Sequence, residues 1–469
     1  MSTIEIDRIV VRDKATGESL GDTPAGTADD VDAAVRTAAA AQSGWAESAP
    51  AARAAVLLAA AAAFEADRER LRRLLVRETG CIAGKADYEI DAAISELHEA
   101  AALTSQPLGA VLPTSHPGRL SYSRQVPVGV VGVLTPWNFP LVLAMRVVGP
   151  ALALGNAVVL KPSPETPLSG GSAIADAFAV AGLPDGLLKV LPGRQEAGEA
   201  VVAHPLVSMV HFTGSTRVGR EIAATCGQLL KKVSLELGGN NALVVLEDAD
   251  IDTAAMIGAW SSFHYQGQTC ISAGRHIVHR SVLDAYVADL QRRAESIAVG
   301  DTTDPAMGLG PMINRTQFDR GAQLLRDAEA AGATVHTGGP DTAPFFRPAV
   351  VTGVTPDMAL WREEIFAPVV AVLPFETDDE AITLVNDTSY GLVNSIVTRD
   401  VTRGLRMADR LHAGMVHIND ATPQDEAIAP FGGIGHSGLG GRSGGVANVA
   451  EFTETRWYTV ATAPVHYPY

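Results

Sequence analysis

Short apolar runs rich in β-branched residues alternate with helix-like segments through the middle of the chain. The runs are Val128–Leu134, Ala157–Leu160, Leu187–Leu191, Ser208–Phe212 and Lys232–Leu235, and the helix-like segments lie near 141–154, 168–181, 196–203 and 216–227. Strands that alternate with helices at this spacing indicate βαβ units and a parallel sheet. Because the runs are almost entirely apolar, we expect helices to cover both faces of that sheet.

A second alternating region follows and predicts a second α/β domain. Strands are expected at Ala242–Leu246, Arg275–Val278, Val369–Leu373, Ser395–Thr398 and Met415–Ile418, with helices at 251–264, 281–296, near 378–386 and near 402–412. The fold class predicted from both regions is therefore α/β, with two domains built on parallel sheets. No internal repeat at a fixed period is found.

The N-terminal part of the chain predicts helices over 27–46 and 51–75. Thr27 and Asp30 match a T-x-x-D capping box, in which side chains satisfy the free amides of a helix start. The Ala-rich run from Ala51 to Phe64 has a high helix propensity, and we interpret it as scaffold.

Two short segments, 106–127 and 452–469, fit neither α/β region because they are Pro-containing or aromatic. By exclusion, we interpret them as extended oligomerisation arms that pack on another subunit. The remaining boundaries predict one domain over 1–105 and 128–237 and a second over 238–430. The 469-residue length gives a soft expectation near three domains at about 150 residues each.

Composition narrows the function classes. Lys plus Arg is 36 and Asp plus Glu is 53, which gives a formal net charge of −17. Nucleic-acid binding needs clustered cations, so this balance argues against a polyanion partner. Hydrophobic residues make up 47% and charged residues 19%, as in ordinary globular chains.

Targeting and redox signals favour a cytoplasmic protein. Cys81, Cys226 and Cys270 show no CxxC spacing, which fits a reducing compartment and supports neither disulfides nor a zinc ribbon. The start, MSTIEIDRIVVRDK, carries charges where a signal peptide is apolar. The uncharged stretches Val56–Phe64 and Val147–Val159 fall short of the roughly 20 residues that a bilayer requires. We therefore expect no membrane association.

A metal site is not expected. His276 and His279 lie on a predicted strand, and their odd separation directs them to opposite faces. No HExxH motif or Cys/His cluster is found.

Cys270 is the first candidate for chemistry. It lies in Gln266–Gly274, where two glycines and Ser272 surround the thiol and give access to it. A free thiol titrates near ~8.5, so reactivity at neutral pH requires a helix N-terminus or a base that lowers its pKa. The alternative is a small buried hydrophobic residue, and the local context leaves both open.

Glu236 and Asn138 each follow a predicted strand, at the sheet edge where open α/β sheets bind ligands. A partly desolvated carboxyl has a raised pKa and can serve as a general base, whereas a solvated Glu236 would have no such role. Asn138, in the stiff segment PWNFP, carries an amide donor for an oxyanion. Its alternative is a hydrogen-bonded turn.

The segment FTGSTRVG is the fourth candidate. Gly214 and Ser215 would present amides and a hydroxyl at a helix N-terminus, which suits a pyrophosphate. The segment matches neither GxGxxG nor the P-loop, so alone it predicts little.

Seven segments in chain order resemble the NAD(P)-dependent aldehyde dehydrogenase superfamily over nearly the whole chain. They are PWNFP, KPSPETP, FTGSTRVG, LELGGNN, GQTC, EEIFAPV and PFGGIGHSGLG. GQTCISAGRHIVH, MVHINDATPQDE and the terminal HYPY are most similar to benzaldehyde or vanillin dehydrogenases. The resemblance implies a Rossmann-like cofactor domain, a catalytic domain and a small strand-rich oligomerisation arm, in a homo-oligomer, dimer or tetramer.

The resemblance also implies roles. Cys270 would be the nucleophile, Glu236 the base that activates water, and Asn138 with the Cys270 amide the oxyanion hole. The cofactor, NAD or NADP, would contact Trp137, Lys161, Gly214, Ser215, Glu364 and Phe366. Adjacency to Asn138 and Cys270 predicts a substrate pocket formed by Phe139, Leu143, Arg146, His264, Thr269 and Ile271.

Two positions depart from the family pattern. Pro164 stands where the family often has a Glu that holds the ribose hydroxyls of NAD, and Glu165 follows it. A carboxylate there repels a 2′-phosphate, so its displacement leaves NADP open alongside NAD. Ala367 stands where Gly is usual, with little expected consequence.

The leading hypothesis is oxidation of an aromatic, benzaldehyde-like aldehyde to its carboxylic acid with NAD(P)+ through a cysteine thiohemiacetal and thioester. Aliphatic aldehydes or semialdehydes are the alternative substrates. CoA-acylating oxidation is a further alternative, but such relatives lack the glutamate that stands here at 236. A nucleotide-binding protein without turnover is the last, since fold alone does not establish activity.

Overall fold

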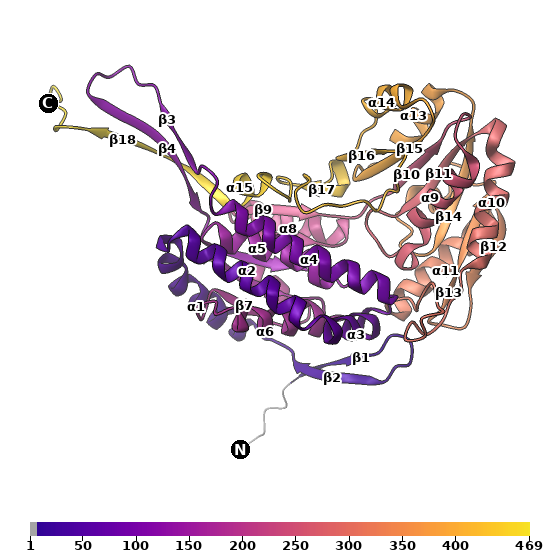
Figure 1. The fold of residues 1–469 in the computed structure, drawn as a ribbon, viewed down its shortest axis with the longest axis horizontal. Coiled ribbons are helices and arrows are strands. Elements are labelled where there is room, and N and C mark those ends of the chain that lie inside the picture. The colour runs from indigo at the N-terminus through magenta and orange to yellow at the C-terminus, as the bar shows by residue number, and fades with distance from the viewer. Residues whose placement is uncertain (1–6) are drawn as a thin grey trace.

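A computed structural model describes residues 7–469, so the first residues of the stretch examined for a signal peptide lie outside it. The chain forms a body with two sheet-containing halves, from which a narrow three-stranded arm projects (Figure 1).

The first half is built on a six-stranded sheet in the order β17-β9-β8-β5-β6-β7. Its strands are β5 (Val130–Leu134), β6 (Ala157–Lys161), β7 (Leu188–Val190), β8 (Val207–Thr213), β9 (Lys232–Glu236) and β17 (Gly438–Leu439). All pairs are parallel except β17 with β9, where Gly438 pairs with Glu236. The expected parallel sheet is therefore confirmed, with one antiparallel edge strand contributed from far along the chain.

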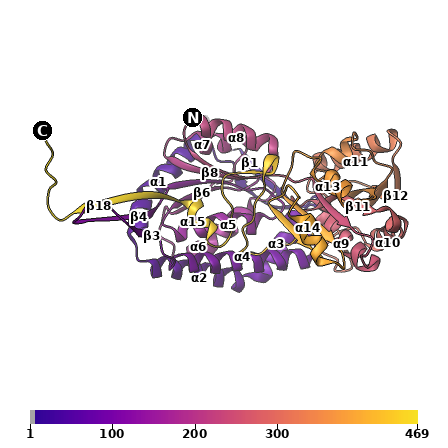
Figure 2. The ribbon, with the colours of Figure 1, turned by 90° about the horizontal axis from the view of Figure 1, so that it is seen from above.

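Helices cover both faces of this sheet, as its apolar strands predict (Figure 2). Helices α7 (Gln195–Ala203) and α8 (Thr216–Gln228) lie on one face. The other carries the entirely buried α5 (Pro140–Ala153), and α4 (Ala83–Leu103) packs on α5. Proline is tolerated at the first turn of α5 because the amide it lacks would have no helical partner.

The N-terminal helices differ in one respect from the prediction. Helix α1 (Ala28–Glu47) begins with the expected capping box of Thr27 and Asp30. The predicted helix over 51–75 is two helices, α2 (Pro50–Ala66) and α3 (Arg68–Thr79), because the chain leaves helical geometry at Asp67. Strong helix propensity on both sides of Asp67 hides this break in the sequence.

Three more features of this half depart from the prediction. The expected helix over 168–181 begins as a π-helical turn, η1 (Leu168–Ser172), before α6 (Ala173–Val180). The strands β1 (Arg8–Arg12) and β2 (Ser19–Pro24) form a separate antiparallel pair that the sequence pattern did not indicate. Helix α4 was also not predicted.

The second half contains a seven-stranded sheet in the order β12-β13-β14-β11-β10-β15-β16. Its strands are β10 (Asn241–Val245), β11 (Ala273–His279), β12 (Thr334–Pro340), β13 (Phe346–Thr352), β14 (Val369–Phe375), β15 (Val393–Val397) and β16 (Met415–Ile418). The sheet is mixed rather than purely parallel because β12 pairs antiparallel with β13. Neither of these two strands was predicted, whereas the other five were.

Helices and short turns connect the strands of this half. They are α9 (Ile251–Phe263), η2 (His264–Gly267), η3 (Arg280–Val282), α10 (Leu283–Ser296), α11 (Arg315–Ala330), α12 (Ala359–Arg362), α13 (Asp378–Asn386) and α14 (Val401–Ala408). Two later elements, η4 (Gly435–Ser437) and α15 (Ala447–Phe452), lie on either side of β17 in the chain, and α15 packs on α5 of the first half. Separate buried apolar clusters fill the two faces of the seven-stranded sheet, and a larger one fills the first half.

The projecting arm joins the two segments that fit neither α/β region. Strands β3 (Gly109–Leu112), β4 (Arg119–Pro127) and β18 (Thr453–Ala461) form an antiparallel sheet in the order β18-β4-β3. The rings of Tyr122 and Tyr458 stack across it at 4.8 Å. Figures 1 and 2 both show this sheet extending away from the body.

Within residues 7–469, no single helix combines the length and apolar character needed to cross a membrane. The helices α1 and α2 reach that length and composition only together, and they are bent by 120°.

Candidate active site

Cys270 lies in the loop between η2 and β11, and unusual backbone holds this loop in place. Tyr265 and Gln266 adopt left-handed conformations, with φ of 49° and 56°. Such conformations are costly for residues other than glycine and persist where the surroundings impose them. Here the Tyr265 hydroxyl donates to the carbonyl of Thr79 at 3.1 Å, and Gln266 Nε2 donates to the carbonyl of Pro311 at 2.7 Å.

The other side of this loop is fastened to the start of β10. Asn241 Nδ2 donates to the carbonyl oxygens of Cys270 and Ser272, each at 2.8 Å. Its Oδ1 accepts from the amide of Val393 at 3.2 Å. A single buried amide side chain therefore fixes the backbone at Cys270 and directly after it.

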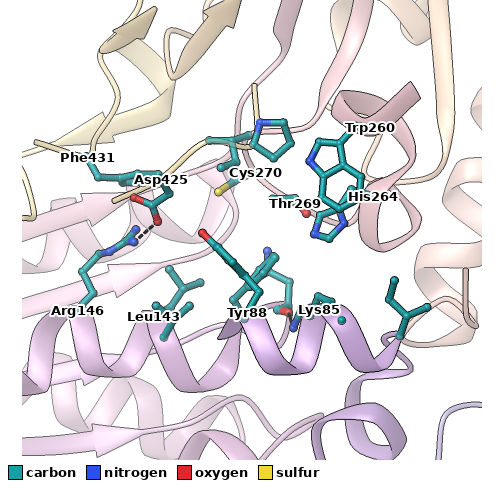
Figure 3. A pocket seen from close by; sticks show the side chains of 17 residues that line it. Lys85, Tyr88, Leu143, Arg146, Trp260, His264, Thr269, Cys270, Asp425 and Phe431 are labelled. Atoms are coloured by element: carbon teal, nitrogen blue, oxygen red, sulfur yellow. Dashed lines mark hydrogen bonds and ion pairs between the residues drawn. The ribbon is translucent and has the colours of Figure 1, made fainter. Parts of the chain in front are cut away.

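A cavity of about 350 Å³ opens on the thiol from one side (Figure 3). Its walls come from α4, α5, the end of α9, the Cys270 loop and the segment after β16. The lining residues are Ile82, Gly84, Lys85, Tyr88, Asn138, Phe139, Val142, Leu143, Arg146, Trp260, His264, Thr269, Cys270, Ile271, Pro423, Asp425 and Phe431. All six residues predicted for the substrate pocket are among them.

The walls of this cavity are aromatic and aliphatic, with charge confined to a few places. The rings of Trp260 and His264 stack at 4.3 Å on the side of Thr269. On the opposite side, Arg146 pairs with Asp425, and its guanidinium lies 4.4 Å from the centre of the Phe431 ring. The Tyr88 side chain lies between these walls, below the thiol in Figure 3.

A second cavity, of about 150 Å³, meets the first at Cys270 and Asn138, which line both. It is lined by Pro136, Trp137, Asn138, Thr213, Gly214, Ser215, Glu236, Leu237, Gly238, Cys270, Gln317, Arg320, Glu364 and Phe366. It therefore brings together Glu236 and every predicted cofactor residue except Lys161.

Glu236 ends β9 as a buried side chain, 5% exposed, so the solvated alternative does not hold. Burial raises its pKa to about 8, and the nearby cation of Arg146 opposes this shift. Its Oε2 has no hydrogen-bond partner among the described residues. A carboxyl with this pKa and a free oxygen is suited to accept a proton near neutral pH.

The thiol of Cys270 does not show the lowered pKa that reactivity requires. Burial raises its pKa to about 12, and the carboxylates of Glu364 and Glu236 add to the rise. The thiol lines both cavities, and the local sequence could not show that two acidic side chains from other segments lie near it.

Asn138 directs its side chain toward the Cys270 loop. Its Nδ2 donates to the carbonyl of Gln268 at 3.1 Å, and this bond uses one of the two amide hydrogens. The side chain is 4% exposed, and its Oδ1 has no partner among the described residues. The second hydrogen remains available at the junction of the two cavities.

The residues of the second cavity fit a nicotinamide dinucleotide. Ser215 caps the N-terminus of α8, an end that attracts anions, and its Oγ accepts from the amide of Val218 at 3.5 Å. The rings of Trp137 and Phe366 meet edge to face at 5.5 Å, and both side chains line this cavity.

Glu364 enters this cavity against a stretch of glycine backbone. Its Oε1 accepts from the amide of Gly239 at 3.1 Å, and burial raises its pKa to about 7. A Cβ at Gly238 would lie 2.2 Å from Glu364 Oε2, so only glycine allows this approach.

Lys161 lies outside both cavities, at the end of β6. It is 8% exposed, its Nζ donates to the carbonyl of Pro162 at 3.0 Å, and burial lowers its pKa to about 8. The displaced carboxylate of Glu165 is bound by Lys14 Nζ at 2.6 Å and by Asn314 Nδ2 at 3.0 Å.

Sequence reasoning missed several cavity residues, notably Lys85, Tyr88, Trp260, Asp425 and Phe431. Tyr88 and Lys85 belong to α4, a helix not predicted, and the others lie at a distance along the chain from Asn138. Asp425 and Phe431 lie within segments that carry the resemblance, which is the only sequence signal for them.

The remaining cysteines and histidines do not join the site. Cys81 and Cys226 are buried and free. His276 is buried between Tyr286 and Ser262, with contacts of 2.9 Å to each. Across residues 7–469, no three His, Cys, Asp or Glu side chains gather in a metal-binding arrangement.

Comparisons with known proteins identify the family of the chain. The aldehyde dehydrogenase family model matches residues 2–458. The chain is 46% identical to a benzaldehyde dehydrogenase [NAD(+)] of Pseudomonas putida, over 98% of this chain and 94% of the relative. It is also 46% identical to a vanillin dehydrogenase of an Amycolatopsis species, with the same coverage.

A solved structure gives the same result for the fold. The betaine aldehyde dehydrogenase of Staphylococcus aureus, in complex with NAD+, superimposes with a TM-score of 0.95 at 30% identity. The match covers 98% of this chain and 92% of that chain. The protein is thus an oxidoreductase that belongs to the aldehyde dehydrogenase family.

Proposed function

We propose that this enzyme oxidises an aromatic aldehyde of the benzaldehyde or vanillin kind to the carboxylic acid, with NAD+ as cofactor. The observation that carries the proposal is the meeting of two cavities at one thiol. An aromatic-lined cavity of about 350 Å³ reaches Cys270 from one side, and a cavity with acidic and aromatic residues reaches it from the other.

The first cavity suits a flat aromatic ring better than a short chain. Trp260, His264 and Phe431 offer ring surfaces, and Leu143 and Ile271 add aliphatic contacts. Apolar surface removed from water contributes roughly 25 cal/mol per Å², so a ring gains more here than a methyl group. Cys270 and Asn138 lie where the aldehyde carbon and oxygen of such a ring would be held.

Cys270 and Asn138, which lie where the two cavities meet, have separate roles in the first chemical step. The Cys270 thiol first gives its proton to solvent water, and the thiolate then adds to the carbonyl carbon, so that the carbonyl oxygen becomes an oxyanion within a thiohemiacetal. The free hydrogen of the Asn138 amide donates to that oxyanion, whose charge appears only as the step proceeds. Donors placed in this way lower the barrier because they need no reorganisation.

Trp137, Gly214, Ser215, Glu364 and Phe366 would hold the cofactor, with Lys161 toward its adenosine end. When bound, the nicotinamide supplies an acceptor for the hydride that the thiohemiacetal loses. Glu236 then takes a proton from water, which attacks the Cys270 thioester and releases the acid. The free Glu236 carboxylate oxygen and its pKa of about 8 support this assignment.

Steady-state kinetics with a panel of aldehydes test the substrate class. We expect a higher kcat/KM for benzaldehyde and its hydroxy and methoxy derivatives than for acetaldehyde, propanal or a semialdehyde. Product analysis should show the free acid whether or not CoA is present. A clear preference for short aliphatic aldehydes, or a CoA ester as product, would contradict the proposal.

We expect the enzyme to prefer NAD+, because a relative at 46% identity is named for this cofactor. The Glu165 carboxylate is bound by Lys14 Nζ at 2.6 Å, so its charge does not exclude NADP+ as a second cofactor. Parallel kinetics with the two cofactors would measure the preference.

We also propose that the arm holds two copies of this chain together, the half with the six-stranded sheet binding the cofactor and the other half carrying the thiol. Val111 and Trp457 on the arm are 79% and 68% exposed, unusual for such large apolar side chains. Light scattering should give a dimer or tetramer, and a Trp457→Glu variant should shift it toward the monomer. A monomeric wild-type protein would contradict the assignment.

A further inference from the structure

A buried ion pair lies directly beneath the Asn138 loop. Lys85 and Glu89 are one turn apart on α4, and neither side chain is exposed to solvent. Lys85 Nζ donates to the backbone carbonyl of Asn138 at 2.8 Å. Glu89 Oε1 accepts from the amide of Leu141 at 2.8 Å. The pair thus forms hydrogen bonds with the backbone before Phe139 and after Pro140, at Asn138 and in the first turn of α5.

The same ammonium group links this loop to the loop that carries the thiol. It lies 4.1 Å from the centre of the Phe139 ring and 4.5 Å from that of Tyr265. The two rings meet edge to face at 5.7 Å. Tyr265 belongs to the left-handed turn that precedes Cys270. Lys85 therefore contacts the segment of Asn138 and the segment of Cys270 at once.

Stability alone does not explain why two charges are buried here. The cost of removing both charges from water often equals or exceeds their mutual attraction, so a buried ion pair is a weak contributor to stability. Its hydrogen bonds have a different consequence. The Asn138 side chain has one bond, to the Gln268 carbonyl, so its position depends on the backbone that Lys85 holds.

We propose that the Lys85–Glu89 pair is a positioning element that aims the Asn138 amide at the oxyanion, an inference that rests on the role proposed for Asn138. The ammonium fixes the Asn138 carbonyl, the carboxylate fixes the first free amide of α5, and the two aromatic rings hold the ammonium in place. Lys85 lines the first cavity, but the pair acts on the reaction through the position of Asn138.

A double-mutant cycle tests this inference. The first variant is Lys85→Met, which leaves the buried Glu89 carboxylate without its cationic partner and is expected to lose stability. The second is the neutral pair Lys85→Met/Glu89→Gln, which removes both charges but keeps an acceptor for the Leu141 amide. Each is made in the wild-type chain and in an Asn138→Ala chain, and kcat/KM for benzaldehyde is measured for those that fold.

Glu78→Gln serves as the matched control. Glu78 is also a fully buried carboxyl that accepts from backbone amides, those of Leu168 and Ser169, but it does not contact the Asn138 loop. We expect it to change the melting temperature and to leave kcat/KM near the wild-type value.

In the wild-type chain, the neutral pair should lower kcat/KM by about 10²-fold, because displacement of a reactive group by about 1 Å has effects of that size. In the Asn138→Ala chain, the same change should have no further effect beyond about twofold. The rate of Cys270 alkylation by iodoacetamide should stay unchanged, because that reaction forms no oxyanion.

The inference would be overturned if the neutral pair lowered kcat/KM by the same factor in the Asn138→Ala chain as in the wild-type chain. The pair would then act independently of Asn138. A neutral-pair variant with wild-type kcat/KM would also overturn it. Failure of the proposed function is distinguishable, since the wild-type protein would then show no aldehyde oxidation or Asn138→Ala no loss of rate.

Discussion

The guanidinium of Arg146 pairs with the carboxylate of Asp425 at the wall of the first cavity, although 279 residues separate them in the chain. On its other side Arg146 donates to Glu96 at 3.0 Å. One cation is thus shared by two carboxylates. The charges of Arg146 and Asp425 both influence the titration of Cys270 and Glu236, since Arg146 lowers and Asp425 raises the pKa of each.

Replacement of Asp425 by Asn should therefore make the thiol more acidic. The new amide can still accept a hydrogen bond from Arg146, but the negative charge of the Asp425 carboxylate is gone. The thiolate is therefore repelled less, and the pKa of the thiol falls. We expect the pH dependence of Cys270 alkylation to move to lower pH. Asp379→Asn is the control, because Asp379 is 81% exposed and pairs with Arg410 at the surface. An unchanged or upward shift for Asp425→Asn would contradict the expected direction.

Glu236→Gln should stop deacylation without stopping the first half of the reaction. A general base accelerates a reaction by about 10²–10⁴-fold, so steady-state kcat should decrease by a factor in that range. A rapid burst of NADH, near one equivalent per active site, should remain. Mass spectrometry should detect the acyl adduct on Cys270. A variant that loses the burst as well would show that Glu236 acts before thioester formation.

The pH dependence of kcat in the wild-type enzyme follows from the same carboxyl. Burial raises the pKa of Glu236 to about 8, and a base accepts a proton only in its ionised form. Where deacylation limits the rate, kcat should rise with pH through a midpoint near 8 and level off above it. The burst amplitude of Glu236→Gln supplies the comparison, because it should lack this midpoint. A midpoint near 4 to 5 would mean that the carboxyl is solvated during turnover.

Cys270→Ser should abolish NADH formation with every aldehyde, because an alcohol is a far weaker nucleophile than a thiol. Cofactor binding, measured by quenching of protein fluorescence, should remain because the change removes no cofactor contact proposed above. Cys226→Ser is the control, since Cys226 is buried in α8 away from both cavities. Residual turnover in Cys270→Ser would point to another nucleophile.

Local patterns predicted most of the strands that place the site. Val130–Leu134 and Lys232–Glu236 are short, apolar and followed by polar residues, so the positions of Asn138 and Glu236 at strand ends were predictable. The family motifs then identified Glu364 and Phe366, which both line the second cavity.

What could not be predicted depends on contacts between distant segments. The sequence around Cys270 gives no sign that Glu364 and Glu236 would raise the thiol pKa. The Lys85–Glu89 pair looks like an ordinary exposed i,i+4 pair until α4 is packed on α5. The break at Asp67 was missed for a related reason, because helix propensity does not show where one helix must turn to cover another.

Lys14 is expected to influence the choice between NAD and NADP. Its Nζ binds Glu165 at 2.6 Å, and this neutralises a carboxylate four residues after Lys161. Lys14→Met would free that charge to repel a 2′-phosphate. At an effective separation near 4 Å in water, the repulsion is about 1 kcal/mol, which corresponds to a roughly fivefold rise in KM for NADP. KM for NAD, which carries no such phosphate, should change much less.

The double variant Lys14→Met/Glu165→Gln separates charge from structure. If the effect of Lys14→Met comes from the freed carboxylate, removal of that charge should return KM for NADP to the wild-type value. If the lysine acts instead by fixing the loop, the double variant should keep the defect, and KM for both cofactors should rise together. If KM for NAD and KM for NADP rise equally in the Lys14→Met variant, the charge of Glu165 does not determine the cofactor preference.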